Sequence, residues 1–377
     1  MKRIKLALFD LQHYEMINVL ISIFSDPNFS IVFFTSKKIA SKIKETSHED
    51  LKYEFIIYED FSSAKSFFNS CEEYILKNKV DAIHFNTIDR DYNLVWKLIK
   101  NTNIHTTTTI HNINTWLNAP FTLNKIALKN YYYRKKILSK SKAIVVTEEL
   151  FISYIRDKKL YTKDILTLPY TIKSKDINHK INKQLRIAIP GAIDGNNRRN
   201  YKFALSVIEK INHLNPNIKF VFIGGVFSSE GEQIFQHIND LIKKGCNIEH
   251  KFNPNSNQLF ENEMSICDVV FMPVKINFKY EGINEVYGKT KVTGVLYDMM
   301  RFQKPGIIPK EHVVPPTITT SLITYTNEDN LIEKILTLEN NKELLENYLT
   351  YAKSNSEYYS TSSIKKRFLP KYVKLFD

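Results

Sequence analysis

The sequence predicts an α/β protein built from two Rossmann-like domains with mainly parallel sheets, and three observations lead to this fold class. Short apolar runs alternate with amphipathic segments of helical length along the whole chain, which is typical of βαβ units. The alternation occurs twice, before and after a polar stretch at residues 171–184 that has no hydrophobic periodicity. The 377 residues are enough for two domains of ordinary size. Between two such halves we expect a central cleft, lined by loops at the carboxyl ends of the strands.

In the first half, each expected strand is a short run of β-branched and aromatic residues that ends in polar residues. The expected strands are Ile4–Phe9, Ser30–Phe34, Phe55–Tyr58, Ala82–Phe85, Thr107–His111 and Ala143–Thr147. Helices are expected at Phe61–Lys77 and Tyr92–Lys100. The first run follows a basic start and so mimics a signal peptide, but Asp10 interrupts it after a few residues, which favours a buried strand.

The second half repeats the pattern after residue 184. The expected strands are Arg186–Pro190, Lys219–Gly224, Asn247–Lys251, Val269–Pro273 and Gly306–Pro309. The expected helices are Tyr201–Ile211, Gly231–Lys243, Ser256–Ile266, Gly294–Phe302 and Asn330–Leu338. In the first of these helices Ala204, Ile208 and Ile211 share one face, as in a helix that covers a sheet. The predicted domains are residues 1–175 and 185–345, joined by a linker at 176–184. Residues 346–377 form a helical segment that we expect to return to the N-terminal domain.

The composition excludes several classes of protein. With 43% hydrophobic and 25% charged residues, it is that of a globular protein rather than of a disordered or fibrous one. Three cysteines far apart in the sequence form neither a disulfide framework nor a metal-ligand pattern, which favours a reducing compartment. No stretch approaches the ~20 apolar residues of a membrane helix. The net charge of +13 indicates an anionic partner, with a lysine-rich proteome as the alternative explanation.

A first candidate anion site is the loop PGAIDGNNRRNYKFAL at residues 190–205. A strand is expected to enter this loop and a helix to leave it. Gly191 lets the backbone approach a ligand closely, the helix N-terminus favours negative charge, and Arg198 and Arg199 add positive charge. The loop is neither a Walker A motif nor a three-glycine dinucleotide fingerprint. We interpret it as a phosphate site, with a basic surface turn as the alternative.

A second candidate anion site is the stretch EVYGKTKVTGVLYDMMRFQKP at residues 285–305. Lysines precede an apolar helix there, and lysines together with free backbone N–H groups bind anions. Asp298, one turn into that helix, can accept both hydrogen bonds of a diol and so is a candidate ribose ligand; a helix-surface acid is the alternative. The candidate donor-binding residues of this stretch are Lys289, Thr290, Lys291, Thr293, Gly294 and Asp298.

Histidines lie at the ends of several expected strands. His111 ends the strand before Asn112 and is expected to face the cleft. Asp10 and His13 lie at the end of the first strand, which is also a cleft position. His84 is more simply interpreted as a core histidine with satisfied hydrogen bonds. No Ser-His-Asp spacing and no HExxH pattern is present.

Residues 120–142, PFTLNKIALKNYYYRKKILSKSK, form a basic segment without an acid. Its basic residues are Lys125, Lys129, Arg134, Lys135, Lys136, Lys140 and Lys142. The residues that share one face of a helical wheel are Leu123, Ile126, Ala127, Tyr133 and Ile137, and that face is interrupted by Asn130 and Arg134. A basic amphipathic helix with interleaved aromatic residues is typical of binding to an anionic membrane surface. A nucleic-acid patch or a solvated helix is the alternative.

The order of these features resembles that of glycosyltransferases with the GT-B fold, most closely those of family 4. The similarity spans nearly the whole chain through short motifs. These motifs are VDAIHF (80–85), TTIHN (108–112), AIVVTEE (143–149), ILTLPYTIK (165–173), IAIPGAIDGNNRRN (187–200), FVFIGG (220–225), CDVVFMPV (267–274) and DMMRFQKPGI (298–307). The resemblance implies an N-terminal domain that binds the acceptor and a C-terminal domain that binds a nucleotide sugar.

The resemblance also implies roles for individual residues. Arg199 and Lys291, together with Lys289, would hold the diphosphate of the donor. Asp298 would hold the ribose, and His111 would contact the donor sugar. Arg199, Asp298 and His111 lie within the motifs given above, and the two lysines lie between the last two of them.

The sequence departs from the family in two places. The family has a pair of glutamates across the second anion site. Aligning Asp298 with the second glutamate places Thr290 at the first, whereas aligning Glu285 with the start of the motif leaves a five-residue insertion before Gly294. Either Thr290 or Glu285 would therefore reach the sugar. The glycine-rich loop that follows the first strand in the family is missing. Retention or inversion at the sugar is therefore left open, and an inverting reaction needs a base. The candidate bases are Asp10, His13 and His111.

We therefore expect a metal-independent, hexosyltransferase-like enzyme without a cofactor, because positive side chains and a helix N-terminus would neutralise the leaving nucleoside diphosphate. It would transfer a sugar from a nucleotide sugar to a hydroxyl of a glycan or lipid-linked acceptor, in bacterial surface polysaccharide biosynthesis such as that of capsule or lipopolysaccharide. We expect it in the cytoplasm, peripheral at the inner face of the plasma membrane. The alternatives are a nucleotide-sugar epimerase of the same fold and a non-enzymatic nucleic-acid-binding protein; no nucleic-acid-binding signature is present, so nucleic acid is not an expected partner.

Overall fold

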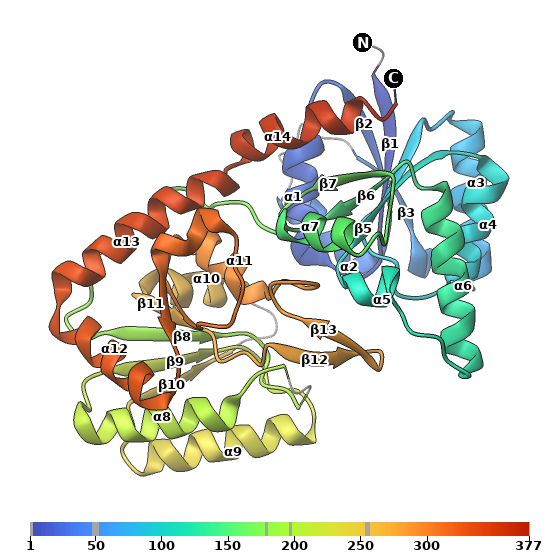
Figure 1. The fold of residues 1–377 in the computed structure, drawn as a ribbon. Coiled ribbons are helices and arrows are strands. Elements are labelled where there is room, and N and C mark those ends of the chain that lie inside the picture. The colour runs from blue at the N-terminus through green and yellow to red at the C-terminus, as the bar shows by residue number, and fades with distance from the viewer. Residues whose placement is uncertain (1–2, 47–52, 178–179, 196–197, 253–256, 377) are drawn as a thin grey trace. The chain divides into compact units, whose positions relative to one another are not determined.

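The computed structural model describes all residues except 1–2, 47–52, 178–179, 196–197, 253–256 and 377, and the chain divides into two compact units (Figure 1). Unit 1 comprises Met1–Tyr170, Tyr280–Glu285 and Thr361–Asp377. Unit 2 comprises Thr171–Lys279 and Val286–Ser360. The polar stretch at residues 171–184 belongs to unit 2, and unit 1 is assembled from three separate pieces of the chain.

Unit 1 is built on a seven-stranded parallel sheet with the strand order β3-β2-β1-β4-β5-β6-β7. The strands are β1 (Ile4–Asp10), β2 (Phe29–Thr35), β3 (Glu54–Ile57), β4 (Ala82–Phe85), β5 (His105–Ile110), β6 (Ala143–Val146) and β7 (Asp164–Thr167). The helices are α1 (Tyr14–Phe24), α2 (Lys37–Thr46), the 3-10 turn η1 (Tyr58–Asp60), α3 (Ala64–Lys77), α4 (Tyr92–Thr102), α5 (Ile113–Leu117), α6 (Lys125–Lys140), α7 (Leu150–Asp157) and α14 (Thr361–Val373).

Helices cover both faces of the sheet in unit 1, which explains why its central strands β1, β4, β5 and β6 are buried along most of their length instead of on alternate residues. Helices α3, α4 and α6 pack side by side on one face, and α1 and α14 lie on the other (Figure 1). Tyr372 of α14 is fully buried, with its ring against Phe24 and Phe29 and its hydroxyl 3.1 Å from Thr107 Oγ1. Helix α14 therefore completes the core of unit 1.

Unit 2 is built on a six-stranded parallel sheet with the order β10-β9-β8-β11-β14-β15. The strands are β8 (Arg186–Pro190), β9 (Lys219–Ile223), β10 (Ile248–Lys251), β11 (Val269–Phe271), β14 (Gly306–Pro309) and β15 (Leu322–Tyr325). The helices are α8 (Tyr201–Leu214), α9 (Ser229–Lys243), α10 (Asn257–Ile266), α11 (Gly294–Phe302), the 3-10 turn η2 (Pro316–Ser321), α12 (Glu328–Asn340), α13 (Lys342–Ser356) and the 3-10 turn η3 (Glu357–Tyr359).

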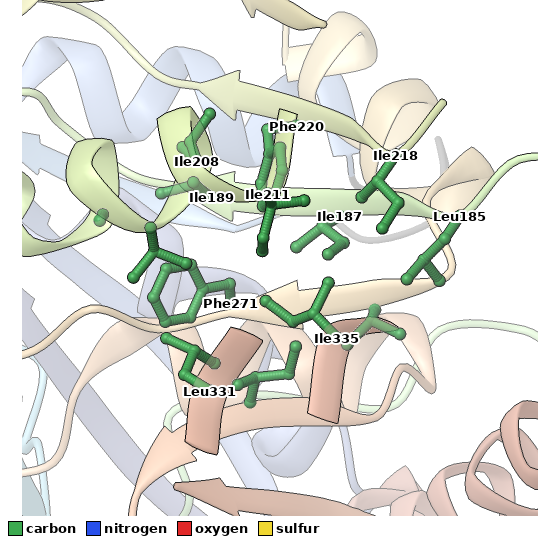
Figure 2. Close-up of a cluster of buried hydrophobic side chains, with 14 of the residues drawn as sticks. Leu185, Ile187, Ile189, Ile208, Ile211, Ile218, Phe220, Phe271, Leu331 and Ile335 are labelled. Carbon is green, nitrogen blue, oxygen red and sulfur yellow. The ribbon is translucent and has the colours of Figure 1, made fainter. Parts of the chain in front are cut away.

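One buried cluster holds α8 and α12 against the same sheet of unit 2. Ile208 and Ile211 of α8 and Leu331 and Ile335 of α12 gather around sheet residues such as Phe271 (Figure 2). Full burial of one such side chain contributes on the order of 1.5–3 kcal/mol, so a few of them fix a helix in place. The apolar face that the sequence predicts for α8 is confirmed.

The sequence-based prediction misses the two-stranded sheet of β12 (Asn277–Tyr280) and β13 (Ile283–Val286). The two residues between these strands, Glu281 (φ 49°) and Gly282 (φ 77°), both have positive φ, as a type I′ hairpin turn requires. Asn, Asp or Gly is usual at the first of these positions, so a glutamate there is strained and needs a compensating contact. The turn belongs to the piece Tyr280–Glu285 of unit 1.

The predicted fold class is confirmed, since both units are α/β with parallel sheets. The predicted strands are present with ends that differ by at most two residues, whereas β7 and β15 were not predicted. The first residue of the helix predicted at Ser256–Ile266 lies outside the described residues. In the part of the chain that the structure describes, no helix has both the length and the apolar character to span a membrane.

Candidate functional site

Unit 1 brings three sequence-predicted residues, Asp10, His13 and His111, together at the carboxyl end of its sheet. Asp10 is the last residue of β1, His13 precedes α1, and His111 follows β5 directly. The strand order of this sheet reverses between β1 and β4, and ligands of open α/β sheets bind outside the carboxyl ends of the strands at such a reversal. Asn86 and Thr87, which follow β4 directly, complete the group.

Asp10 organises this group and is almost fully buried, at 2% exposure. Its Oδ1 accepts hydrogen bonds from the backbone N–H groups of Gln12 at 2.8 Å and His13 at 2.9 Å. Its Oδ2 accepts from the side-chain amide of Asn86 and from Thr87 Oγ1 at 3.4 Å. Each carboxylate oxygen is thus occupied by two donors, so the carboxylate holds the two loops after β1 and β4 together.

The two histidines of the group meet at Thr87. His13 Nδ1 lies 2.6 Å from Thr87 Oγ1, and His111 Nε2 lies 3.2 Å from the same oxygen and 2.8 Å from the Asn86 carbonyl oxygen. The ring centroids of the two histidines are 5.0 Å apart, and Tyr170 meets both rings edge-on. Sequence reasoning named the histidines but missed Asn86 and Thr87, whose only signal is their position directly after a buried strand.

His84 is a core residue, which confirms its interpretation from the sequence. It is fully buried in β4, with Nδ1 2.9 Å from Thr107 Oγ1 and Nε2 3.2 Å from Thr109 Oγ1. Burial lowers the pKa of His84 to about 3, so the ring is neutral at neutral pH.

Glu285, the predicted sugar-contacting residue, lies buried against the start of α5 in unit 1. Its Oε1 accepts from the backbone N–H and the hydroxyl of Thr115, both at 2.8 Å, and its Oε2 accepts from the backbone N–H of Asn114 at 3.4 Å. These N–H groups belong to the first turn of a helix, where they have no partner within the helix. These hydrogen bonds of Glu285 are those of a carboxylate that fixes α5.

Arg134 was predicted to be one of the basic residues with which segment 120–142 contacts a membrane surface, and this is wrong because Arg134 is buried. Arg134 is 3% exposed, and its guanidinium stacks on Tyr92 and Trp116. It donates to Tyr92 Oη and to Glu281 Oε2, both at 2.7 Å. The reason is that Arg134 shares its helix face with buried Ile137, and the carboxylate that compensates its charge comes from a turn far along the chain.

The residues predicted to share the apolar face of the same segment do not all have the same environment. Ile137 packs into the core, whereas Leu123 (87% exposed) and Ile126 (73%) face solvent. Phe121, Leu128 and Tyr132 are exposed too, and the lysines of the segment are exposed or half-buried around them. Asn124, whose side chain accepts from the N–H groups of Ile126 and Ala127, caps α6 and leaves Leu123 outside the helix. Residues 121–136, without Arg134, therefore form an apolar and basic surface, which we call the α6 patch.

Unit 2 places the predicted phosphate loop where its own strand order reverses, between β8 and β11. Gly191 follows β8 with a φ of 106°, a conformation that favours glycine. A Cβ atom at Gly224, which follows β9, would collide with the Gly191 carbonyl group, so the two loops need glycine at this approach. The loops after β8 and β11 also pair, because Lys275 N–H donates to the Arg198 carbonyl at 3.0 Å.

Arg199 lies folded over this loop. Its guanidinium donates to the Pro190 carbonyl and to Tyr201 Oη at 3.2 Å, and a side chain at Gly191 would collide with it. Arg198 forms an ion pair with Asp194 at 3.0 Å. Both predicted arginines thus lie in the loop at the carboxyl end of β8. Asn196 and Asn197, which precede the arginines in this loop, lie outside the described residues.

The second predicted anion stretch forms a tight turn followed by α11. Thr290 is buried and its Oγ1 accepts from Val286 N–H at 2.8 Å, so it stabilises the turn. Lys289 is exposed and Lys291 half-buried. Tyr287 belongs to this turn. Burial raises the pKa of its phenol, and the charges of Arg198 and Arg199 oppose that rise. The turn therefore lies near the phosphate loop within unit 2.

The start of α11 has the properties of an anion site. Thr293 is the N-cap residue but makes no side-chain cap hydrogen bond, and no acid lies in the first turn. Gly294 has open space where a side chain would be. Asp298 lies half-buried one turn into the helix. Leu296 N–H donates to the Thr293 carbonyl at 3.1 Å. The N–H groups of Gly294 and Val295 belong to the positions that have no partner within a helix, where an anionic ligand can bind.

Among the residues that the structure describes, no group of three or more His, Cys, Asp and Glu side chains could hold a metal ion. Cys71, Cys246 and Cys267 are buried and free.

Comparison with known proteins gives a match in structure only. No protein-family model matches the chain, and no curated protein matches it in sequence. A glycosyltransferase from Rickettsia africae ESF-5 matches with a TM-score of 0.71 at 13% identity over 100% of both chains. The pneumococcal O-GlcNAc transferase GtfA, in complex with UDP and GlcNAc, matches with a TM-score of 0.70 at 10% identity over 100% of this chain and 99% of that one. A candidate UDP-N-acetylglucosamine 2-epimerase from Listeria monocytogenes matches with a TM-score of 0.64 at 14% identity over 100% of this chain and 97% of that one. The chain has the GT-B fold.

Proposed function

We propose that the protein is a glycosyltransferase that moves a sugar from a nucleoside diphosphate sugar to a hydroxyl group of a glycan or lipid-linked acceptor. The observation that carries this proposal is the candidate anion site of unit 2, where the glycine loop with Arg199 neighbours the turn that leads into the uncapped start of α11. The GT-B fold supports it, because solved structures with this fold include proteins described as glycosyltransferases.

In this proposal the diphosphate lies against Gly191, Arg199 and Lys291, with Lys289 at the exposed side, and Asp298 binds the ribose. The guanidinium, the ammonium groups and the helix N-terminus would stabilise the charge that develops on the leaving nucleoside diphosphate. This arrangement supplies without a metal ion the positive charge that the leaving group requires, so we propose metal-independent transfer.

In unit 1 we propose a histidine as the base that an inverting transfer needs. Both oxygens of Asp10 already accept hydrogen bonds, which supports a positioning role for Asp10 and leaves His13 or His111 to take the proton of the acceptor hydroxyl. The contacts of Glu285 likewise support a positioning role, in which it holds α5.

A thermal-shift panel of nucleoside diphosphates, with and without magnesium, tests the donor site. A ligand that binds only the folded protein raises the melting midpoint by an amount set by its concentration relative to its Kd. We expect one nucleotide to stabilise the protein without magnesium, and Arg199→Ala and Lys291→Ala each to abolish this shift. Lys243→Ala, at an exposed position of α9, is the control that should keep it. No shift with any nucleotide would contradict the proposal.

A nucleotide-sugar epimerase is the second candidate, and the similarity to the Listeria structure supports it. An epimerase converts its nucleotide sugar without an acceptor. Product that forms only when an acceptor hydroxyl compound is added would therefore favour the transferase. Epimerised nucleotide sugar in the absence of any acceptor would favour the epimerase.

We further propose that the enzyme acts in the cytoplasm on an acceptor at an anionic membrane surface, as in bacterial surface polysaccharide synthesis, and that the α6 patch contacts the lipid. The patch combines exposed Phe121, Leu123 and Ile126 with lysines and contains no acid. Apolar side chains can enter the interface of a bilayer while lysines contact anionic headgroups.

Sedimentation with vesicles tests this contact. We expect binding to vesicles with anionic lipid and weaker binding to neutral ones. Leu123→Ser/Ile126→Ser and Lys125→Gln/Lys129→Gln variants should each sediment less, with Arg134 left intact because it is buried. Equal sedimentation of all variants would contradict the lipid contact, and salt-sensitive retention of nucleic acid would favour a nucleic-acid partner.

A further inference from the structure

Thr87 is the point where Asp10, His13 and His111 meet, and its hydroxyl has three neighbours to satisfy. Its Oγ1 lies 3.4 Å from Asp10 Oδ2, 2.6 Å from His13 Nδ1 and 3.2 Å from His111 Nε2. Thr87 is 6% exposed, so water is a poor substitute for these partners. A threonine hydroxyl has one hydrogen to donate and two lone pairs to accept. Its three contacts can therefore all be hydrogen bonds in only a few arrangements of protons.

The contacts of His111 determine where its own proton lies. Nε2 of His111 is 2.8 Å from the Asn86 carbonyl oxygen, which can only accept. Nε2 must therefore carry a hydrogen, and the same hydrogen also points to Thr87 at the longer distance of 3.2 Å. Thr87 is then an acceptor from His111.

The requirement that all three contacts be hydrogen bonds then places the proton of Thr87. Because an ionised carboxylate can only accept, the contact with Asp10 Oδ2 is a hydrogen bond only if Thr87 directs its hydrogen there rather than to His13 Nδ1. With its hydrogen used in this way, Thr87 can only accept from His13, and His13 must carry its hydrogen on Nδ1. Every donor and acceptor of the Thr87 hydroxyl is then used once, and Nε2 of His13 keeps a lone pair. Among the described residues, that nitrogen has no hydrogen-bond partner, and the ring is half-buried.

We propose that Thr87 is a positioning residue that connects Asp10 to His13 and holds His13 in its Nδ1–H tautomer, so that Nε2 is the basic nitrogen. Free imidazole side chains favour the other tautomer, so the protein has to impose this one. The role of His13 as the base rests on the proposed function, whereas the tautomer does not.

The chain of hydrogen bonds from Asp10 through Thr87 to His13, which we call the relay, has a direct consequence for proton transfer. When an acceptor O–H bond breaks and its proton moves to His13 Nε2, the ring becomes an imidazolium and the oxygen keeps the electron pair. That pair forms the new bond to the sugar carbon, whose bond to the nucleoside diphosphate breaks with its electron pair going to the leaving diphosphate. The Nδ1–H group of the imidazolium then bonds to Thr87, whose own hydrogen bonds to the Asp10 carboxylate. The negative charge of Asp10 thus stabilises the imidazolium through one hydroxyl group, and no proton has to leave Thr87.

The tautomer can be measured on the full chain labelled with ¹⁵N-histidine, by long-range ¹H–¹⁵N correlation, with the His13 signals assigned from a His13→Gln variant. We expect the Nδ1–H form at His13 in the wild type and in Thr87→Ser, which keeps the hydroxyl. We expect Thr87→Val to change His13 towards the Nε2–H form. Thr106→Val is the matched control, because the buried Thr106 hydroxyl has no hydrogen-bond partner among the described residues. An Nε2–H form in the wild type, or an unchanged tautomer in Thr87→Val, would overturn the relay.

Activity supplies a separate readout. Once a nucleotide sugar and acceptor are found, we expect Thr87→Val to lower kcat at least about tenfold with little change in KM for the donor, and Thr87→Ser to recover most of the loss. Equal kcat values for Thr87→Val and the wild type would overturn the positioning role. The Nδ1–H form in a protein that transfers no sugar would support the relay and contradict the proposed function instead.

Discussion

Acid should destabilise unit 1 through His84, and the size of the effect follows from its burial. The pKa of His84 is lowered by burial to about 3, from an ordinary value near 6.5. Because the folded state has the lower pKa, the unfolded chain binds this proton first as the pH falls. The stabilisation is fully present above the unfolded pKa and is lost between about pH 6.5 and pH 3. Between pH 7 and pH 5 the loss from this one group is about 2 kcal/mol.

The chain offers a selective probe for this measurement. Both of its tryptophans, Trp96 and Trp116, belong to unit 1, so their fluorescence during urea unfolding reports on that unit. The comparison variant is His84→Gln, whose amide can still donate to and accept from Thr107 and Thr109 but does not titrate. Every other histidine is present in both proteins, so its titration cancels in the difference.

We expect the free energy of unfolding of the wild type to fall between pH 7 and pH 5 by about 2 kcal/mol more than that of His84→Gln. The altered packing of His84→Gln adds an offset that is the same at every pH, so only the change of the difference with pH reports on the titration of His84. If the two proteins differ by that offset alone and so have the same pH dependence, His84 is not held neutral by its surroundings and the reasoning is refuted.

Two further predictions concern the phosphate loop after β8 and the hairpin turn between β12 and β13. Gly191→Ala should weaken nucleoside diphosphate binding at least about tenfold in calorimetry, because the new methyl group collides with the Arg199 guanidinium; Gly245→Ala, which has a similar positive φ but nothing within 4 Å, should bind normally. Glu281→Gln should lower the stability of unit 1 by about 1–3 kcal/mol in the tryptophan assay, because the buried guanidinium of Arg134 loses its anion. Exposed Glu73→Gln should change stability by less than about 0.5 kcal/mol, and an equal effect of both glutamate variants would contradict this account.

The fold, and those residues of the candidate site that lie directly after buried strands, could be predicted because local sequence patterns determine where the strands begin and end. Buried parallel strands are continuous apolar runs, so their carboxyl ends, and with them Asp10, His111 and the loop before Arg199, can be found from the sequence. Thr87 could not be found in this way, because a lone threonine after a strand carries no pattern and its importance comes only from its three neighbours.

Arg134 shows where local patterns lead to a wrong prediction. Its neighbours in sequence are lysines and tyrosines, which is why it was assigned to a basic surface. Its partner Glu281 lies 147 positions away, in a hairpin turn that a helical wheel cannot include. Glu285 was assigned to the sugar from its alignment with the glutamate pair of the family that the chain resembles, and such an alignment carries no information about its hydrogen-bond partners on α5.

The three pieces of unit 1 have a consequence for the synthesis of the protein. When residue 170 has left the ribosome, unit 1 still lacks the Glu281 carboxylate that compensates Arg134 and the Tyr372 ring that fills its core. Unit 2 is contained within residues 171–360 and is complete before α14 has been made. Domains generally fold in the order of their synthesis, but here we expect the unit that starts first to finish last. In chains stalled just after unit 2 has emerged, unit 2 should resist protease while unit 1 is still cut.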